Sequence, residues 1–308
     1  MGRRIVVSGI GVVSSLGNNV RDTWENILKS KSGIGKITKF PTDDFPDSIS
    51  KIAGEIKIVD DSKPETKNFF DPSLFVDKKD VKKMDSFIWY GMAAAAEAVA
   101  DAGWNINDEA ELEKTGVLIS SGIGGINSIQ DTSITFREKG IRKISPFFIP
   151  QSLINLLSGH IAIKYGYHGS NFSVVSACAT GNHSIGEGAE IIRRGDADVM
   201  VVGGSESSVG EICIGGFSNM RALSIKYNDN PEKASRPWDR NRDGFVMGEG
   251  AGVLILEEYE HAKRRGAKIY AELIGYGTSC DAYHITSPHF EGKGAQLAMN
   301  MALRKAEI

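Results

Sequence analysis

Short apolar runs alternate with helix-forming segments along most of this sequence, and this alternation strongly constrains its fold. Five runs rich in Val, Ile and Leu have the length of buried strands: residues 3–11, 115–125, 172–175, 198–204 and 252–256. Apolar residues with helical spacing occupy residues 20–28, 82–102, 149–163 and 183–194. Buried strands alternating with helices are typical of α/β proteins. We therefore expect an α/β domain with a mostly parallel five-stranded sheet.

The composition is that of an ordinary globular chain. Its 308 residues are 41% hydrophobic and 24% charged, with a formal net charge of −3. This charge argues against a dedicated nucleic-acid binder, whose binding domain would be strongly basic. Only three cysteines occur, Cys178, Cys213 and Cys280, and their spacing suggests no disulfide framework, so we expect a cytoplasmic protein. No apolar run approaches the roughly 18 residues of a membrane span.

Cys178 lies where a predicted strand runs directly into a predicted helix, in the stretch FSVVSACATGNHSIGE. A thiol at a helix N-terminus faces unpaired N–H groups and the positive end of the helix dipole, which favour the thiolate. The same N–H groups can stabilise an oxyanion. Residue spacing alone leaves two interpretations open, a catalytic nucleophile and a small buried apolar side chain.

Two further stretches have simple structural interpretations. The run RRIVVSGIG resembles the start of a dinucleotide-binding domain, but Ser14 stands where the third glycine of that motif would be. Residues 29–80 are interrupted by glycine and proline, and we expect this segment to lie on the surface.

Several motifs in chain order resemble those of the β-ketoacyl-acyl-carrier-protein synthases, in particular the long-chain elongating enzymes of type II fatty-acid synthesis. These motifs are VVSACATGNHSIGEGAE around Cys178, SSGIGG at 120–125, RKISPFFIP at 142–150, SRPWDRNRDGFVMGEGAG at 235–252 and DAYHITSP at 281–288. The resemblance implies a layered thiolase-like fold made of two similar halves. We expect residues 1–266 to form the half that carries the nucleophile, and residues 267–308 to begin an incomplete second half.

The resemblance also implies a mechanism. Cys178 would accept an acyl chain from the carrier's phosphopantetheine, and decarboxylated malonyl-carrier would then attack this acyl-enzyme in a Claisen condensation. No cofactor or metal would be bound by the chain itself. In the family, two histidines in HGTSTP and KSMTGH motifs stabilise the malonyl oxygen, and this sequence contains neither motif. Helical geometry places His183 about 140° around the axis from Cys178, so we do not expect it to replace them.

Other positions match family residues that bind the substrates or the carrier, although several are equally compatible with ordinary packing. The acyl-pocket matches are Ile123, Phe217, Phe148 and Ile149, with the last two reaching toward a partner subunit; Phe245 matches a residue beside the malonyl site, and Thr286 and Ser287 match the pantetheine tunnel. Lys82, Lys83 and Arg221 match a basic patch that contacts the acidic carrier protein.

The sequence therefore predicts a condensing enzyme that forms a homodimer and binds acyl carrier protein, with no nucleic-acid or membrane partner. One alternative is an incomplete chain that dimerises and binds the carrier without condensing substrates. A polyketide chain-length factor is disfavoured because Cys178 is intact, and a thiolase is disfavoured because its cysteine has a different sequence context.

Overall fold

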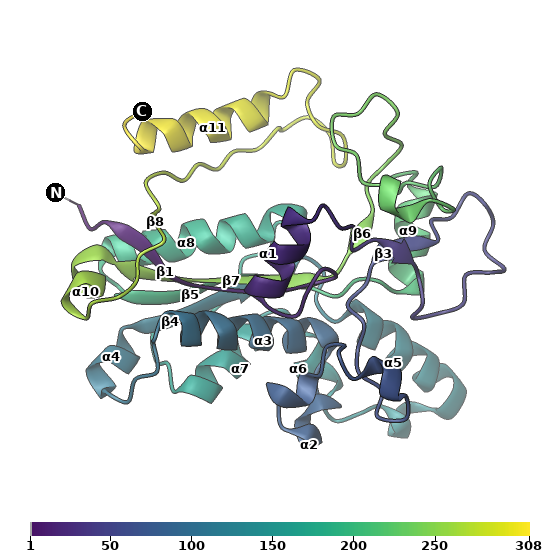
Figure 1. The fold of residues 1–308 in the computed structure, drawn as a ribbon, viewed down its shortest axis with the longest axis horizontal. Coiled ribbons are helices and arrows are strands. Elements are labelled where there is room, and N and C mark those ends of the chain that lie inside the picture. Colours follow the sequence, from purple (N-terminus) through teal and green to yellow (C-terminus); the bar gives the residue numbers. More distant parts are fainter. Residues whose placement is uncertain (1) are drawn as a thin grey trace.

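The computed structural model describes residues 2–308 and is organised around a five-stranded sheet with helices on both faces (Figure 1). The sheet has the order β4-β5-β7-β1-β8. Its strands are β1 (Ile5–Ser14), β4 (Thr115–Ser120), β5 (Val199–Glu206), β7 (Gly250–Glu258) and β8 (Ala271–Glu272). A second sheet contains the three short strands β2 (Gly35–Lys36), β3 (Ile52–Gly54) and β6 (Met247–Gly248).

The α-helices form layers around the large sheet. Their bounds are α1 Val20–Leu28, α2 Lys78–Val81, α3 Ser86–Asp101, α4 Glu109–Glu113, α5 Ile126–Lys139, α6 Phe148–Ser152, α7 Leu156–Tyr165, α8 Thr180–Arg194, α9 Glu211–Asn219, α10 Tyr259–Arg264 and α11 Lys293–Lys305. In Figure 1, α3 and α7 lie below the sheet, α8 lies above it, and α11 lies beyond α8. Helix α8 therefore has the sheet on one side and the C-terminal segment on the other.

The sheet is mixed, so the expectation of a mostly parallel sheet was wrong in this detail. β4 and β5 are parallel neighbours, whereas β5–β7, β7–β1 and β1–β8 are antiparallel. β1 runs in the same direction as β4 and β5, but β7 is inserted between β1 and β5. The long connections that precede β4 and β5 allow parallel pairing, and sequence periodicity does not reveal which strands become neighbours. The expected α/β class is nevertheless confirmed.

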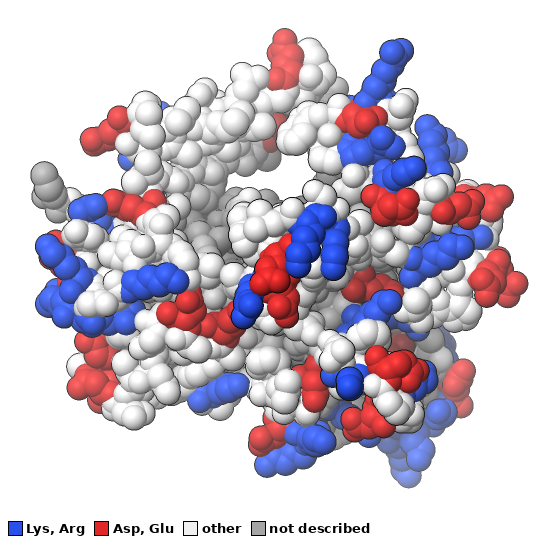
Figure 2. Space-filling view, viewed as in Figure 1, with Lys and Arg blue, Asp and Glu red and all other residues white. Residues whose placement is uncertain are grey.

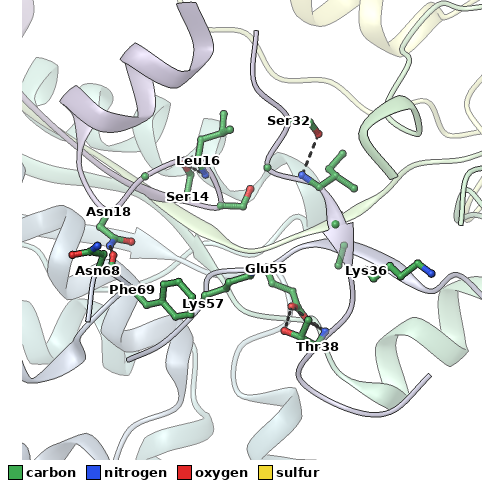
Figure 3. Close-up of a pocket in the computed structure, with 16 residues that line it drawn as sticks. Ser14, Leu16, Asn18, Ser32, Lys36, Thr38, Glu55, Lys57, Asn68 and Phe69 are labelled. Atoms are coloured by element: carbon green, nitrogen blue, oxygen red, sulfur yellow. Dashed lines mark hydrogen bonds between the residues drawn. The ribbon is translucent and has the colours of Figure 1, made fainter. Parts of the chain in front are cut away.

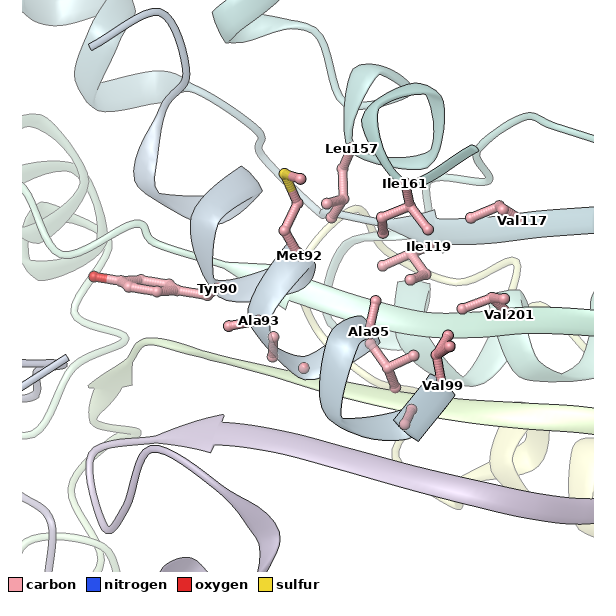
Figure 4. Close-up of a cluster of buried hydrophobic side chains, with 14 of the residues drawn as sticks. Tyr90, Met92, Ala93, Ala95, Val99, Val117, Ile119, Leu157, Ile161 and Val201 are labelled. Atoms are coloured by element: carbon pink, nitrogen blue, oxygen red, sulfur yellow. The ribbon is translucent and has the colours of Figure 1, made fainter. Parts of the chain in front are cut away.

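Helix α3 covers the lower face of the sheet and forms the main core with α7. In the close-up of Figure 4, Leu157 and Ile161 of α7 lie next to Ile119 of β4, and the alanine-rich turns of α3 lie beside them. Small side chains let α3 approach the sheet closely. α3 also supplies carboxylates to the edge of β1: Asp101 accepts a 3.0 Å hydrogen bond from the N–H of Ile10, and Glu97 accepts one of 2.9 Å from Val12. These bonds protect edge groups of β1 that β8 is too short to pair.

The run at residues 172–175 is not the buried strand that its composition predicts. Only Asn171, just before it, forms a bridge with β4, and Phe172 and Val175 are 42% and 56% exposed. Serine hydroxyls accept the hydrogen bonds of the backbone N–H groups here. Ile119 N–H donates to Ser158 Oγ over 2.9 Å, and Val174 N–H donates to Ser120 Oγ over 3.1 Å. The segment therefore lies beside β4 without forming a ladder with it.

Several helix boundaries also differ from the predicted ones. α3 begins at Ser86 because the Asp85 side chain accepts a hydrogen bond from the N–H of Phe87 in its first turn, and the predicted helix at 149–163 is divided into α6 and α7. α5 was missed because its apolar residues are largely exposed. Within residues 29–80, Ile52, Ile56 and Phe70 are fully buried, so that segment is only partly superficial.

Candidate active site

Cys178 occupies a tight turn at the start of α8. The 3-10 turn Ala177–Ala179 leads directly into the helix, and Ala177 has a φ of 51°, in the left-handed region that alanine rarely occupies. The N–H of Ser176 donates to Thr180 Oγ1 over 2.9 Å, which fixes the turn against the first residue of the helix. The predicted bend at Cys178 is thus present, and the thiol is exposed and unbonded to another cysteine.

Close packing sets the position of this helix start relative to the sheet. A methyl group added to Gly204 at the end of β5 would lie 3.2 Å from the Cα of Gly181 in the first turn of α8. Ser184 Oγ donates a 3.0 Å hydrogen bond to Ser120 Oγ at the end of β4. The ends of two adjacent parallel strands therefore hold the helix that directly follows the Cys178 turn.

Cys178 opens into a cavity of about 660 Å³ above the ends of the sheet strands. The cavity is formed where β1, β4 and β5 end and β7 begins, with residues of α8, α9 and the 245–248 segment completing its wall. Its predicted members are Cys178, Ile123, Phe217 and Phe245. Four residues that are far apart in the sequence are therefore brought together around one apolar space.

The aromatic side chains form a defined part of this wall. The rings of Phe217 and Phe245 meet edge to face, with centroids 5.4 Å apart and planes at 79°. Ile123, on the turn after β4, is also part of the wall. Such a surface can bind an apolar chain beside the thiol by burying it from water.

Sequence reasoning missed Glu206, an acidic residue in the same cavity wall. It is the last residue of β5, and its carboxylate accepts hydrogen bonds from Ser121, Ser208 and the backbone of the 122–123 turn. A polar residue at the end of a buried strand of an α/β sheet was the available signal, since ligands often bind where such strands end.

Four predicted substrate residues lie outside this cavity wall. Phe148 and Ile149 begin the short helix α6, and Ile149 is 60% exposed. Thr286 and Ser287 lie in an exposed loop between β8 and α11. Their backbone N–H groups donate to His284 Nδ1 over 3.2 and 3.1 Å. The structure therefore does not join these two pairs to the Cys178 site.

The predicted carrier-binding residues come from two separate segments. Lys82 is exposed at the end of α2, and Lys83 forms a 2.6 Å ion pair with Asp80 while its ammonium lies 4.8 Å from the ring centroid of Phe147. Arg221 follows α9, is exposed and has a φ of 57°. Figure 2 shows that, on the visible face, basic and acidic side chains are interspersed.

His183 does not line the Cys178 cavity. Its Nδ1 forms a short hydrogen bond with Ser176 Oγ, and its ring meets Tyr276 edge to face at 6.4 Å. It instead faces the space between α8, residues 273–279 and α11. Among the residues that line the Cys178 cavity in the described part of the chain there is no histidine.

A second cavity, of about 570 Å³, lies beside the end of β1 and is mainly polar (Figure 3). Many of its polar groups already bond to one another. Thr38 donates to Glu55 from both its N–H and its hydroxyl, and Asn18 donates to the backbone of Asn68. This cavity is therefore a weaker candidate for an active site than the cavity that contains Cys178.

In residues 2–308, no cluster of three or more His, Cys, Asp or Glu is arranged to hold a metal ion. No helix in the same range is long and apolar enough to cross a membrane.

A thiol at a helix start, open to an apolar cavity, defines a site that can carry an acyl group on cysteine. Residues 2–262 match the model of the β-ketoacyl synthase N-terminal domain, and the chain belongs to that family. The chain is 50% identical over 306 residues to the 3-oxoacyl-[acyl-carrier-protein] synthase 2 of Rhizobium meliloti (strain 1021), covering 99% of this chain and 71% of the relative. It is 49% identical over 317 residues to a mitochondrial 3-oxoacyl-[acyl-carrier-protein] synthase of Arabidopsis thaliana, covering 99% and 67%.

Solved structures confirm the layered fold of this family. A β-ketoacyl synthase from Burkholderia phymatum STM815 matches with a TM-score of 0.84 and 29% identity, over 99% of this chain and 71% of that one. The type II polyketide ketosynthase AntDE, solved in complex with its acyl carrier protein AntF, matches with a TM-score of 0.84 and 31% identity over 100% and 71%. The predicted family and thiolase-like fold are therefore confirmed.

Proposed function

We propose that this chain acts in type II fatty-acid elongation as a 3-oxoacyl-[acyl-carrier-protein] synthase. The observation that carries the proposal is the position of Cys178, at the start of α8 and in the wall of an apolar cavity with Ile123, Phe217 and Phe245. The names of the similar curated proteins support the same activity.

In the first half-reaction, the Cys178 thiolate attacks the carbonyl carbon of an acyl thioester on the carrier. The bond between that carbon and the pantetheine sulfur breaks, so the acyl group moves to Cys178 and the pantetheine thiolate leaves and takes up a proton. N–H groups at a helix start have no acceptor within the helix. They can therefore stabilise the negative oxygen that forms during this exchange.

In the second half-reaction, malonyl-carrier loses carbon dioxide and its enolate attacks the acyl-enzyme. A new carbon–carbon bond forms, and the Cys178 thiolate is released. Negative charge grows on the malonyl thioester oxygen, so this step needs hydrogen-bond donors close to it. Because no histidine of residues 2–308 lines the cavity, the proposal includes a limit: these residues by themselves support the acylation of Cys178, and condensation needs hydrogen-bond donors that they do not place at the cavity.

The experiment incubates the purified chain with octanoyl-carrier and malonyl-carrier, and follows acyl-enzyme mass and released carbon dioxide separately. We expect a mass increase of one octanoyl group on the wild type, none on Cys178→Ala, and no carbon dioxide above background. Absence of acylation would contradict the proposed function. Release of carbon dioxide with formation of the 3-oxoacyl product would contradict only the limit, because donors within the chain would then suffice.

The proposal also assigns partners and a compartment. Acyl carrier protein would bring both substrates on phosphopantetheine, so the chain would need no cofactor of its own. A homodimer is supported by the exposed apolar residues 172 and 175 beside the edge strand β4. A cytoplasmic location is supported by the absence of disulfides among the three cysteines, all of which lie in the described residues.

A further inference from the structure

Glu206 accepts four hydrogen bonds with its two carboxylate oxygens. Oε1 accepts from Ser121 Oγ and Ser208 Oγ, both over 2.9 Å. Oε2 accepts from the N–H groups of Gly122 and Ile123, over 2.9 and 3.2 Å. Three of these four donors belong to the turn that follows β4, so one side chain holds most of that turn.

Neutral groups surround this carboxylate. None of the ion pairs in the described residues includes Glu206, and its four partners are hydroxyl and backbone N–H groups. Hydrogen bonds to an ionised acceptor are shorter and stronger than those between neutral groups. Glu206 is therefore placed to fix the geometry of its donors rather than to pair with a cation.

The turn that Glu206 holds also contacts the nucleophile turn. Gly122 lies between the two, because a methyl group added to it would be 3.1 Å from the carbonyl oxygen of Ala177 and 3.1 Å from Glu206 Oε2. Ser121 Oγ, which donates to Glu206, also accepts a 2.7 Å hydrogen bond from the N–H of Gly124. The position of Ile123 relative to Cys178 is thus determined by bonds that converge on Glu206.

We propose that Glu206 is a positioning residue for acyl-chain selectivity, because it holds the turn that places Ile123 in the wall of the Cys178 cavity. This inference rests on the proposed function, since it takes an acyl thioester as the substrate. Glu206 itself does not react. It acts through Ile123, whose side chain limits the space available to the chain that Cys178 carries.

The chemistry of the four bonds distinguishes two substitutions. Glutamine can keep them: its carbonyl oxygen accepts from the two N–H groups, while its amide N–H₂ donates to the serine hydroxyls, which accept as readily as they donate. Alanine removes all four acceptor positions and leaves the N–H groups of Gly122 and Ile123 without a partner. Glu206→Gln should therefore preserve the position of Ile123, and Glu206→Ala should release it.

The test compares the acylation rate of Cys178 with butanoyl, octanoyl and hexadecanoyl thioesters of pantetheine, using intact-protein mass. For Glu206→Ala we expect the ratio of rates between the preferred and the poorest chain to fall about tenfold, within the range that pocket contacts can provide. Glu206→Gln should keep the wild-type ratio. Glu211→Ala, an exposed acidic residue on α9 that pairs with Gln130, is the matched control.

A second readout does not depend on activity. Hydrogen–deuterium exchange of peptides covering residues 121–125 should accelerate in Glu206→Ala and remain slow in Glu206→Gln. If Glu206→Ala does not fold, Ser121→Ala should change the chain-length ratio in the same direction, because it removes one bond to Glu206 and one to Gly124. A folded Glu206→Ala protein with the wild-type chain-length ratio would overturn the inference. A wild type that is not acylated by any thioester would instead contradict the proposed function. In that case the positioning role is tested by hydrogen–deuterium exchange alone, and an unchanged exchange rate of residues 121–125 in Glu206→Ala would overturn it.

Discussion

His261 Nε2 lies 2.9 Å from Glu111 Oε2, although 150 residues separate them in the sequence. On the other side of the ring, His261 Nδ1 lies 2.6 Å from Glu257 Oε1. Glu257 in turn accepts two hydrogen bonds from Arg265, over 2.6 and 2.7 Å, and the His261 ring meets Trp104 edge to face. These contacts connect α4, β7 and α10 at the end of the sheet away from Cys178.

This cluster predicts a pH dependence of stability. The hydrogen bond with Glu257, and then the one with Glu111, raise the pKa of His261 in spite of its burial. A raised folded-state pKa stabilises the fold below the unfolded pKa of about 6.5, and this contribution is lost as the pH rises through the folded pKa. We expect the free energy of unfolding in urea to fall above neutral pH in the wild type, and to fall less in His261→Asn. His168→Asn, an exposed histidine, should behave as the wild type.

The same cluster also predicts a loss of folding stability at low pH. Burial opposes the charged form of Glu257, but hydrogen bonds from Arg265 and His261 outweigh it and lower the pKa of Glu257 to about 2. The stabilisation by this carboxylate is therefore present above its unfolded pKa of about 4.3 and is lost as the pH falls toward 2. A Glu257→Gln protein with the same stability as the wild type at pH 6 would show that the cluster contributes little.

The close approach of α3 to β1 predicts strong destabilisation by a single methyl group. A Cβ on Gly11 would lie 1.9 Å from the carbonyl oxygen of Ala94, and α3 cannot withdraw without opening the main core. We expect Gly11→Ala to lower the free energy of unfolding by about 3 kcal/mol, the upper range for an overpacked core. Urea denaturation measures this, with Gly252→Ala as the control because its added methyl group meets nothing within 4 Å. Equal stability of the two variants would contradict the packing argument.

Much of this arrangement could be predicted from the sequence. Four of the five apolar runs are strands of the large sheet, and the bend at Cys178 precedes a helix that ends at Arg194 as expected. The local sequence pattern sufficed there, because burial of one strand or helix produces a regular spacing of apolar residues within that element. Gly9 and Gly11 also mark a close approach of backbone, but their partner is the helix α3 rather than a dinucleotide.

The features that were missed depend on groups distant in the sequence. The strand expected at residues 172–175 is absent because Ser158 and Ser120 take hydrogen bonds that a ladder would need. Sheet order depends on which strands become neighbours, and the role of Glu206 depends on a turn that lies more than 80 residues earlier. None of these pairings has a period or a spacing that a single sequence could reveal.

The three cysteines should differ in reactivity. Burial raises the pKa of Cys213, and the nearby Glu206 carboxylate adds to this effect, so Cys213 should react slowest. Cys178 and Cys280 are both exposed, but of these two only Cys178 lies in a turn that leads directly into an α-helix. We expect limited iodoacetamide treatment, mapped by mass spectrometry, to label Cys178 first. Faster labelling of Cys280 would contradict the claim that the helix start makes the Cys178 thiol more reactive.

Charge reversal should test the predicted carrier-binding residues. We expect Lys82→Glu combined with Lys83→Glu and Arg221→Glu to weaken binding of acyl carrier protein about tenfold or more, because the contacts would be electrostatic. Wild-type affinity should fall as salt rises, since exposed charges are screened. Titration calorimetry at two salt concentrations measures both effects, and Lys31→Glu on the loop after α1 is a control that reverses a single exposed charge elsewhere. Unchanged affinity of the triple variant for acyl carrier protein would show that these three residues are solvated side chains without a role in carrier binding.

The exposed segment beside β4 predicts the oligomeric state. Phe172 and Val175 present apolar side chains to solvent next to the edge strand of the sheet. An exposed apolar edge is a liability for a monomer, and a second copy related by a twofold axis would cover it with the same segment. We expect the wild type to sediment as a dimer at micromolar concentration and Val175→Lys to sediment as a monomer, because the lysine charge would be buried in the contact. Ile163→Lys places the same charge at an exposed apolar position on α7 and should remain dimeric. A monomeric wild type, or a dimer that survives Val175→Lys unchanged, would place the contact elsewhere or exclude it.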